Sequence, residues 1–154
     1  IKYSNGVALK DASERLRNDK ELVLEAIKLS KGYALDFASE ELRSNREVVL
    51  AAVKLDGQYL YDASEELQDD IELVLIAVAQ NGENLKYASD RLRNNKKVVL
   101  TAIKNTYSFN HTPYYMPIGI DYMSKELKED PEIKKVISIR RKELESVSEN
   151  SKKC

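Results

Sequence analysis

Few residues in this sequence of 154 amino acids could carry out chemistry. His111 is the single histidine, and Cys154, the last residue, is the single cysteine. Histidine-paired catalysis, an internal disulfide and the usual zinc ligand sets all need more of these residues. We therefore expect no catalytic residue, no metal site and no cofactor, and we interpret His111 as an ordinary loop residue.

Serine recurs at a regular spacing, which raises the question of nucleophilic catalysis. The recurring dipeptides are Ala12-Ser13, Ala38-Ser39, Ala63-Ser64 and Ala88-Ser89. A serine nucleophile needs an adjacent base, and none recurs beside these four equivalent serines, so we do not expect them to be catalytic. We interpret these serines as small residues at close helix contacts, or as side chains bonded to the carbonyl four residues earlier. The acidic residue after each serine is expected to pair with an arginine of the array.

The serines belong to an internal repeat with spacings of 26, 25 and 25 residues. Seven residues before each serine stands a glycine: Gly6, Gly32, Gly57 and Gly82. Leucine recurs three residues after each serine, and a Val-Leu pair begins ten residues after it. A degraded fifth copy follows at Met123-Ser124. The chain is therefore organised as tandem units.

Each unit predicts two short helices. In the outer helix, Leu35, Ala38 and Leu42 fall on one side, whereas the apolar residues from 48 to 53 cover a wide arc of the inner helix. The predicted N-caps of the inner helices are Asn18, Ser44, Asp69 and Asn94, with capping boxes at Glu21, Glu47 and Glu72 and a broken box at Lys97. Gly32, Gly57 and Gly82 are expected to end these helices in the left-handed conformation. Such short helices are marginal alone, so stability must come from stacking.

The predicted fold class is an all-α, solenoid-like array of short helical hairpins with a period of about 25 residues. A longer C-terminal helix closes it, with Asp130 as N-cap and Pro131 at its first position. The predicted divisions are four repeats over 1–104, an irregular aromatic insertion over 105–121, a degenerate fifth repeat with the closing helix over 122–147, and a flexible tail over 148–154.

The pattern Gly-x-x-Leu-x-x-Ala-Ser-x-x-Leu-Arg-x-Asp/Asn, followed by Glu-x-Val-Leu-x-Ala-Val, resembles the repeat of domain of unknown function 4116 over residues 6–104. Gln68 departs from it, because the other units have Arg17, Arg43 and Arg93 there. The resemblance implies tandem copies within larger proteins of protists, large viruses and intracellular bacteria, including secreted effector-like proteins. It implies no catalytic residues.

Charge and hydropathy narrow the range of partners. Lysine and arginine number 25 and aspartate and glutamate 26, so the net charge of −1 gives no global field for nucleic acid, and we expect none to bind. The sequence has no run of about 18 apolar residues, so we expect no membrane insertion. One basic cluster comprises Lys134, Lys135, Arg140, Arg141 and Lys142. We interpret it as the polar face of the closing helix, with a contact for phosphate, anionic lipid or an acidic protein as the alternative.

Aromatic residues that do not repeat are the candidates for partner binding. On the outer helices they are Tyr33, Phe37, Tyr59, Tyr61 and Tyr87, and in the insertion Tyr107, Phe109, Tyr114 and Tyr115. Tyrosine suits a surface that must be apolar and still be satisfied in water, so the first set could form a partner-binding strip. The alternative is that these rings fill grooves between adjacent units. The second set is expected to cap the array or to form a ligand-binding loop.

These observations predict a non-enzymatic module for protein–protein interaction within a larger protein of the cytoplasm, or of a host cell's cytosol if that protein is a secreted effector. We read the chain, which begins at Ile1, as a fragment. The alternative is an accessory or substrate-recruiting region of an enzyme whose catalytic domain lies outside these residues. The partner's identity and the oligomeric state stay open.

Overall fold

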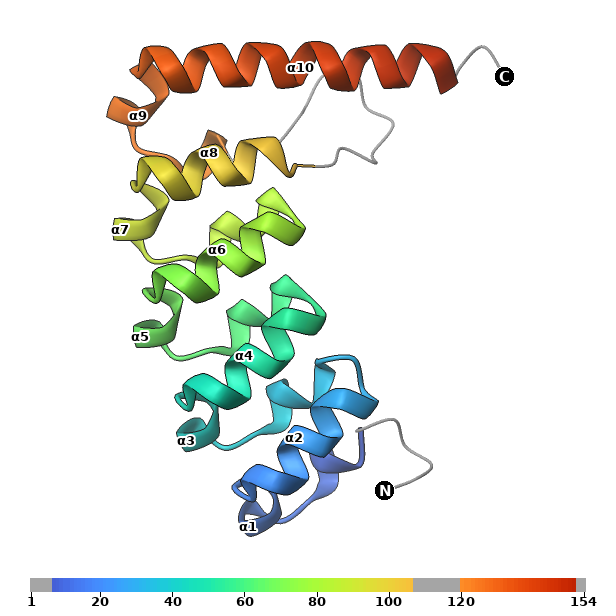
Figure 1. The fold of residues 1–154 in the computed structure, drawn as a ribbon. Helices are drawn as coiled ribbons and strands as arrows, with labels where there is room; N and C mark the ends of the chain where they lie inside the picture. The colour runs from blue at the N-terminus through green and yellow to red at the C-terminus, as the bar shows by residue number, and fades with distance from the viewer. Residues whose placement is uncertain (1–6, 107–119, 152–154) are drawn as a thin grey trace.

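The computed structural model describes residues 7–106 and 120–151, and every regular element in these ranges is helical. The chain forms units that stack one on the next from the N-terminus to the C-terminus (Figure 1). Each unit consists of a 3-10 helix (η), a short α-helix of about one turn and a longer α-helix. The prediction of an all-α repeat array is therefore confirmed.

The units are numbered in chain order. Unit 1 has η1 (Val7–Asp11), α1 (Glu14–Arg17) and α2 (Lys20–Leu29), and unit 2 has η2 (Tyr33–Phe37), α3 (Glu40–Arg43) and α4 (Arg46–Leu55). Unit 3 has η3 (Gly57–Asp62), α5 (Glu65–Gln68) and α6 (Ile71–Gln80), and unit 4 has η4 (Gly82–Tyr87), α7 (Asp90–Arg93) and α8 (Lys96–Lys104). Unit 5 has η5 (Ile120–Tyr122), α9 (Lys125–Glu129) and α10 (Pro131–Ser151).

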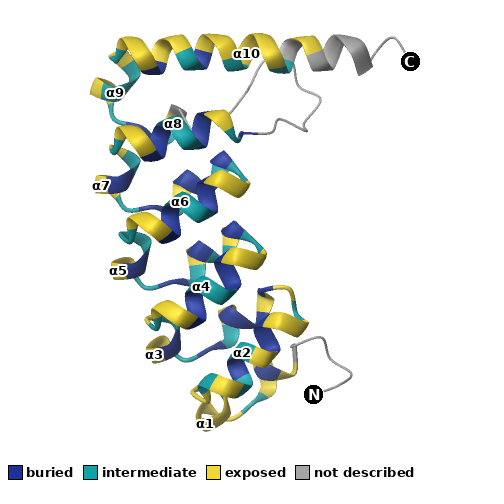
Figure 2. Cartoon of the chain, in the orientation of Figure 1, coloured by how far each residue is buried: buried dark blue, intermediate teal, exposed yellow. Residues whose placement is uncertain are grey.

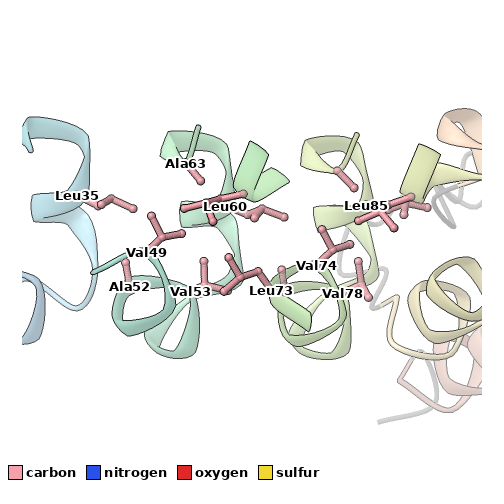
Figure 3. Close-up of a cluster of buried hydrophobic side chains, with 14 of the residues drawn as sticks. Leu35, Val49, Ala52, Val53, Leu60, Ala63, Leu73, Val74, Val78 and Leu85 are labelled. Atoms are coloured by element: carbon pink, nitrogen blue, oxygen red, sulfur yellow. The ribbon is translucent and has the colours of Figure 1, made fainter. Parts of the chain in front are cut away.

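The core lies between the row of long helices and the row of 3-10 helices. Leu35, Leu60 and Leu85 line it from successive 3-10 helices (Figure 3). Val53 of α4 and Leu73 of α6, both fully buried, lie side by side where the two long helices contact each other (Figure 3). The short α-helices run along one edge of the stack, and their outer residues are largely exposed (Figure 2). Each unit thus buries its apolar face mainly against its neighbours.

The segment predicted as one outer helix is two separate pieces. Ala38 is extended, with φ −66° and ψ 156°, and separates η2 from α3. Ser39 is the N-cap of α3, because its hydroxyl oxygen accepts a hydrogen bond from the Leu42 amide at 3.2 Å. The Ser39 amide donates to the Arg17 carbonyl of unit 1 at 3.0 Å, so it is not used in a helix of its own unit. A continuous outer helix was therefore a wrong prediction. The Ser39 hydroxyl donates to Asn18 of unit 1, not to the carbonyl four residues earlier.

The long helices begin one residue later than predicted. In unit 2 the side-chain oxygen of Asn45 accepts from the amides of Glu47 and Val48 at 3.2 and 3.3 Å, whereas Ser44 is the C-cap of α3. The corresponding N-caps are Asp19, Asp70 and Asn95, in place of Asn18, Asp69 and Asn94. The predicted capping boxes were wrong as well, because the glutamates stand two residues after the actual caps and a box needs three.

Only one of the three glycines is left-handed. Gly32 has φ 106°, preceded by Lys31 at φ 56°, and these residues accommodate the extra residue of the first, 26-residue spacing. Gly57 is needed for a different reason, because a Cβ there would lie 2.8 Å from both the Cα and the carbonyl oxygen of Ala77. The Gly82 position is blocked in the same way by the backbone of unit 4. The left-handed prediction is confirmed at Gly32 and wrong at Gly57 and Gly82.

The fifth unit keeps the pattern and ends in a longer helix. Ser124 caps α9 by accepting from the Leu127 amide at 3.3 Å. Asp130 caps α10 as predicted, accepting from the amides of Glu132 and Ile133 at 2.9 and 3.1 Å. This helix continues to Ser151, so the prediction of a flexible tail from residue 148 was wrong for its first four residues. No proline or glycine follows Pro131 to end the helix earlier.

Successive units are joined by recurring polar contacts. The amides of Ser39, Ser64 and Ser89 donate at 3.0 Å to the carbonyls of Arg17, Arg43 and Gln68 in the preceding unit. A cation at the first position of one long helix pairs with a glutamate in the first turn of the next, as in Lys20–Glu47 at 2.6 Å, Arg46–Glu72 at 2.5 Å and Lys96–Glu132 at 2.9 Å. Between units 3 and 4 the corresponding residues are Ile71 and Lys97. Lys97, which the sequence analysis took as a broken capping box, therefore replaces the glutamate of this row of ion pairs.

Candidate functional site

The candidate aromatic residues that the structure describes stand on 3-10 helices but form no single strip. Tyr61 and Tyr33 are exposed, at 67% and 43%, whereas Phe37, Tyr59 and Tyr87 are half-buried and pack against the core. Tyr33 contacts Phe37 edge-on, with ring centroids 5.2 Å apart. Tyr61 and Tyr87 come from adjacent units, and their centroids are 5.6 Å apart. Some rings are therefore exposed and others fill gaps between units, and the partner-binding strip stays a prediction for the exposed ones.

Tyr59 belongs to the gap-filling group. Its ring occupies the space that a Cβ on Gly32 of the preceding unit would need. Burial is the main cause that raises the pKa of the Tyr59 hydroxyl above its ordinary value. We assign Tyr59 to the packing between units 2 and 3.

Tyr61 and Tyr87 line an open groove of about 720 Å³ between units 3 and 4, which we call the 3–4 groove. Its polar lining consists of Glu65, Gln68, Lys86, Ser89, Asp90 and Arg93. These residues stand on η4, on α5, and on α7 or its N-cap, so two stacked units are needed to build the groove.

Gln68 fixes the backbone on which Tyr61 stands. Its Nε2 lies 3.3, 3.1 and 3.2 Å from the carbonyl oxygens of Leu60, Tyr61 and Ala63, at the end of η3. The amide thus adds a side-chain donor to carbonyls at the end of η3, of which that of Leu60 also accepts from the Ala63 amide. Gln68 was visible in the sequence as the one departure from the recurring arginine, but its part in the groove was not predicted.

The groove carries charges of both signs. The ammonium group of Lys86 lies 4.8 Å from the Tyr87 ring centroid. A side-chain hydrogen bond to Tyr87 is the main cause that raises the pKa of Lys86. Arg93 pairs with Asp90 on the same short helix, which confirms in unit 4 the acid–arginine pairing predicted from the sequence. A ligand here would meet two aromatic rings with both cations and carboxylates within reach.

The interface between units 2 and 3 has a charged residue where the groove has an aromatic one. Asp62 holds the position that Tyr87 holds in unit 4. Burial, followed by repulsion from Asp36, raises the pKa of the Asp62 carboxyl to about 6, although Arg43 acts in the opposite direction. The equivalent surfaces between units therefore differ in chemistry. Of these two interfaces, the one between units 3 and 4 has the paired tyrosines, and the one between units 2 and 3 has Asp62 in place of Tyr87.

Two residues of the basic cluster on the closing helix form ion pairs. Lys134 pairs with Glu129, and Arg140 pairs with Glu143 at 2.9 Å. Arg140 also donates to the Thr106 carbonyl at 3.0 Å, which links α10 to the end of unit 4. These contacts favour the interpretation of the cluster as the polar face of a helix.

Within residues 7–106 and 120–151, no group of three or more histidine, cysteine, aspartate or glutamate side chains could hold a metal ion. Over the same part of the chain, none of the helices has the length and apolar character to cross a membrane. The second set of candidates, Tyr107, Phe109, Tyr114 and Tyr115, lies outside the described residues, and so does His111.

The stacked units of short and long helices define a helical-repeat protein. The model of the family described as Domain of unknown function (DUF4116) matches residues 3–43, 29–68, 45–93 and 70–116. The chain belongs to this family. No curated protein and no solved structure matches the chain significantly.

Proposed function

We propose that the chain is a non-enzymatic protein-binding module whose 3–4 groove receives a short segment of a partner protein. The observation that carries the proposal is the 67% exposure of Tyr61 beside the half-buried ring of Tyr87. An exposed tyrosine ring contributes little to folding, yet tyrosine is among the residues that most often dominate binding energy at interfaces.

The groove is also preorganised, which lowers the entropic cost of binding. The Gln68 amide holds the backbone at the end of η3, and Tyr87 supports the Tyr61 ring from the next unit. A partner segment with an apolar side chain for the two rings would fit this lining, and polar groups next to it would meet Glu65 and Lys86.

The proposal extends to a location in the cytoplasm, or in a host cell's cytosol if the parent protein is a secreted effector. Fractionation of expressing cells would test this location.

The test is a selection of displayed random peptides on the purified chain, followed by affinity measurements with the best synthetic peptide. We expect Tyr61→Ser to weaken binding by about tenfold or more, since hot-spot truncations cost about 2 kcal/mol. Tyr61→Phe should retain most of the affinity because the ring is kept. The circular dichroism spectrum and melting temperature should change little in either variant, because the ring is exposed.

Tyr33→Ser is the matched control, since Tyr33 is exposed at 43% but does not line the groove. It should leave peptide binding unchanged. Equal losses in both variants, or selected peptides that bind Tyr61→Ser as well as the wild type, would contradict the proposal.

A further inference from the structure

The long helix of unit 3 differs from the long helices of units 1, 2 and 4 on its outer side. The first, fifth and ninth residues of each long helix are four residues apart and therefore form one stripe along the helix. In units 1, 2 and 4 the stripe consists of a cation, a leucine and a lysine. These residues are Lys20, Leu24 and Lys28; Arg46, Leu50 and Lys54; and Lys96, Leu100 and Lys104. In α6 the stripe consists of Ile71, Leu75 and Ala79, and we call it the α6 stripe.

The α6 stripe is open to solvent. Ile71 is 37% exposed, Ala79 is exposed and Leu75 is half-buried. Ile76, which is also half-buried, stands three residues before Ala79 and so borders the stripe. The core does not require apolar residues at the two ends of the stripe, because the other three units have cations there. Single exposed apolar side chains are ordinary on a protein surface, but a contiguous set that replaces charges indicates a contact surface.

Three lysines lie around the α6 stripe. In the row of long helices α6 packs between α4 and α8 (Figure 1). Lys54 on α4 and Lys104 on α8 hold the same repeat position as Ala79, and Lys97 on α8 holds the position opposite Ile71 in the ion-pair row. All three lysines are exposed. No carboxylate within residues 7–106 and 120–151 forms an ion pair with any of them.

The helices that form this surface supply little negative charge to it. Glu72 is the one charged residue of α6, and Arg46 of α4 already holds its carboxylate at 2.5 Å. The sequence of α8 contains three lysines and no acidic residue. The surface therefore combines an apolar stripe with uncompensated positive charge beside it. Complementarity favours a partner that has carboxylates next to its apolar residues.

We propose that the α6 stripe, together with Lys54, Lys97 and Lys104, docks an amphipathic α-helix of a partner protein whose apolar residues are flanked by aspartate or glutamate. Residues four apart form the ridges by which one helix packs along another, and the small side chain of Ala79 allows a close approach. The surface lies on the long helices, whereas the 3–4 groove is lined by residues of the 3-10 helices and the short α-helices. The proposal is therefore independent of the function proposed for that groove.

Two other occupants fit this surface less well. In a two-fold dimer the same surface of both copies would meet, which brings the lysines of the two chains together without matching carboxylates. An anionic bilayer favours long apolar or aromatic side chains that reach into the interface. Leu75 is half-buried and Ala79 is short, so the α6 stripe has little to insert. Both occupants are outcomes of the test.

The test is a selection of displayed helical peptides on the purified chain. Each peptide carries leucines four residues apart, and the positions next to them are randomised among glutamate, glutamine and lysine. We expect glutamate to be enriched at the randomised positions. The best synthetic peptide should bind more weakly as the salt concentration rises, because salt screens the contact with the lysines.

The double substitution Ile71→Lys, Ala79→Lys gives α6 the stripe of the other units, and it should weaken binding of the peptide by about tenfold or more. Added cations alone favour an acidic helix, so this loss identifies the apolar contact. Lys97→Glu should also weaken binding and reduce its dependence on salt. Leu55→Lys is the matched control, since Leu55 is 48% exposed but lies outside the stripe. Leu55→Lys should leave the affinity unchanged, and so should Tyr61→Ser, which alters only the groove.

Enrichment of glutamine or lysine, the absence of any enrichment, or equal affinity of the wild type and the double variant would overturn the proposal. Dimers of the wild type that the double variant does not form would assign the stripe to a second copy, and binding to phosphatidylserine vesicles lost in the same variant would assign it to a membrane. If the double variant melts early, Lys97→Glu decides alone, because glutamate holds this position in the other units. A peptide selected for the 3–4 groove should bind the double variant as it binds the wild type, so failure of one proposal does not affect the other.

Discussion

Equivalent residues of the repeat can hold their positions for different physical reasons. Gly32 has a backbone that favours glycine, whereas Gly57 has an ordinary backbone but no room for a Cβ. The sequence shows only that both glycines hold the same position in the repeat. It does not show the space around Gly57, which is limited by Ala77 of the same unit's long helix. The recurrence of glycine in the repeat therefore indicates that glycine is required, but it does not show why.

Gly57→Ala should destabilise the array by about 1–3 kcal/mol, because the new Cβ would lie 2.8 Å from backbone atoms of Ala77 that cannot move cheaply. Urea denaturation followed by circular dichroism measures the change. The exposed Gln58→Ala is the neighbouring control and should alter the free energy of unfolding much less. An unchanged midpoint for Gly57→Ala would show that the packing between η3 and α6 is looser than described.

Asp62 predicts a pH-dependent contribution to stability. Its pKa is raised in the folded state to about 6, mainly by burial, so the folded chain binds the proton more tightly than the unfolded chain does. Stability from this residue therefore rises as the pH falls from 7 towards 5. Asp62→Asn should stabilise the chain at pH 7 by about 1 kcal/mol or less, and this advantage should shrink at pH 5. Urea midpoints of both chains at the two pH values provide the measurement, and an advantage that grows on acidification would contradict the assigned cause.

The candidate site was predictable from the sequence only in part. Non-repeating aromatics on the outer helices led to Tyr61 and Tyr87, since a residue that breaks a repeat is not required by the scaffold. Tyr59 could not be separated from them, because its burial depends on Gly32 in the preceding unit. Which outer residues meet across an interface depends on how far successive units are rotated, and one unit's periodicity does not contain that angle.

At the scale of the elements, the period, the helical class and the long helices were predictable, but the outer helix was not. Apolar periodicity favoured one continuous helix, whereas the Ser39 amide bonds to the Arg17 carbonyl of another unit and Ser39 starts a new helix. The position of the N-caps failed for a local reason. Ser44 and Asn45 are both good capping residues, and propensity alone cannot choose between neighbours.

The ion-pair row between long helices predicts a compensating pair of substitutions. Ile71 replaces the usual cation in unit 3, and Lys97 replaces the usual glutamate in unit 4. Ile71→Lys alone should therefore destabilise by about 0.5 kcal/mol, because it places two cations opposite each other. Adding Lys97→Glu should recover that loss and restore a pair like Arg46–Glu72. A double-mutant cycle from urea midpoints at low salt gives the coupling, and a coupling of zero would mean that the two side chains do not face each other.

At the scale of the whole molecule, the chain is an array with two unlike ends. Its long-helix row stops at α10, whose outer side carries Lys134 and Ser138 where earlier helices carry buried apolar residues. Unit 1 has no such replacement, and Leu16 stays apolar and exposed. Because each unit is stabilised mainly by its neighbours, removal of one end should destabilise the adjacent unit most.

Deleting residues 130–154 tests this locality. Ile133 is fully buried, and α10 packs on α8, so the deletion should expose Val99 and Ile103 of unit 4. We expect hydrogen exchange to lose protection first in α8, less in α6 and least in α4, with a lower melting temperature overall. Ile133→Ala in the complete chain should show the same gradient in weaker form, at a cost of about 2–5 kcal/mol, whereas Ile139→Ala, exposed at 49%, should not. Uniform loss of protection from α2 to α8 would mean that the array unfolds as one cooperative block, and no loss in α8 would mean that α10 is not its cover.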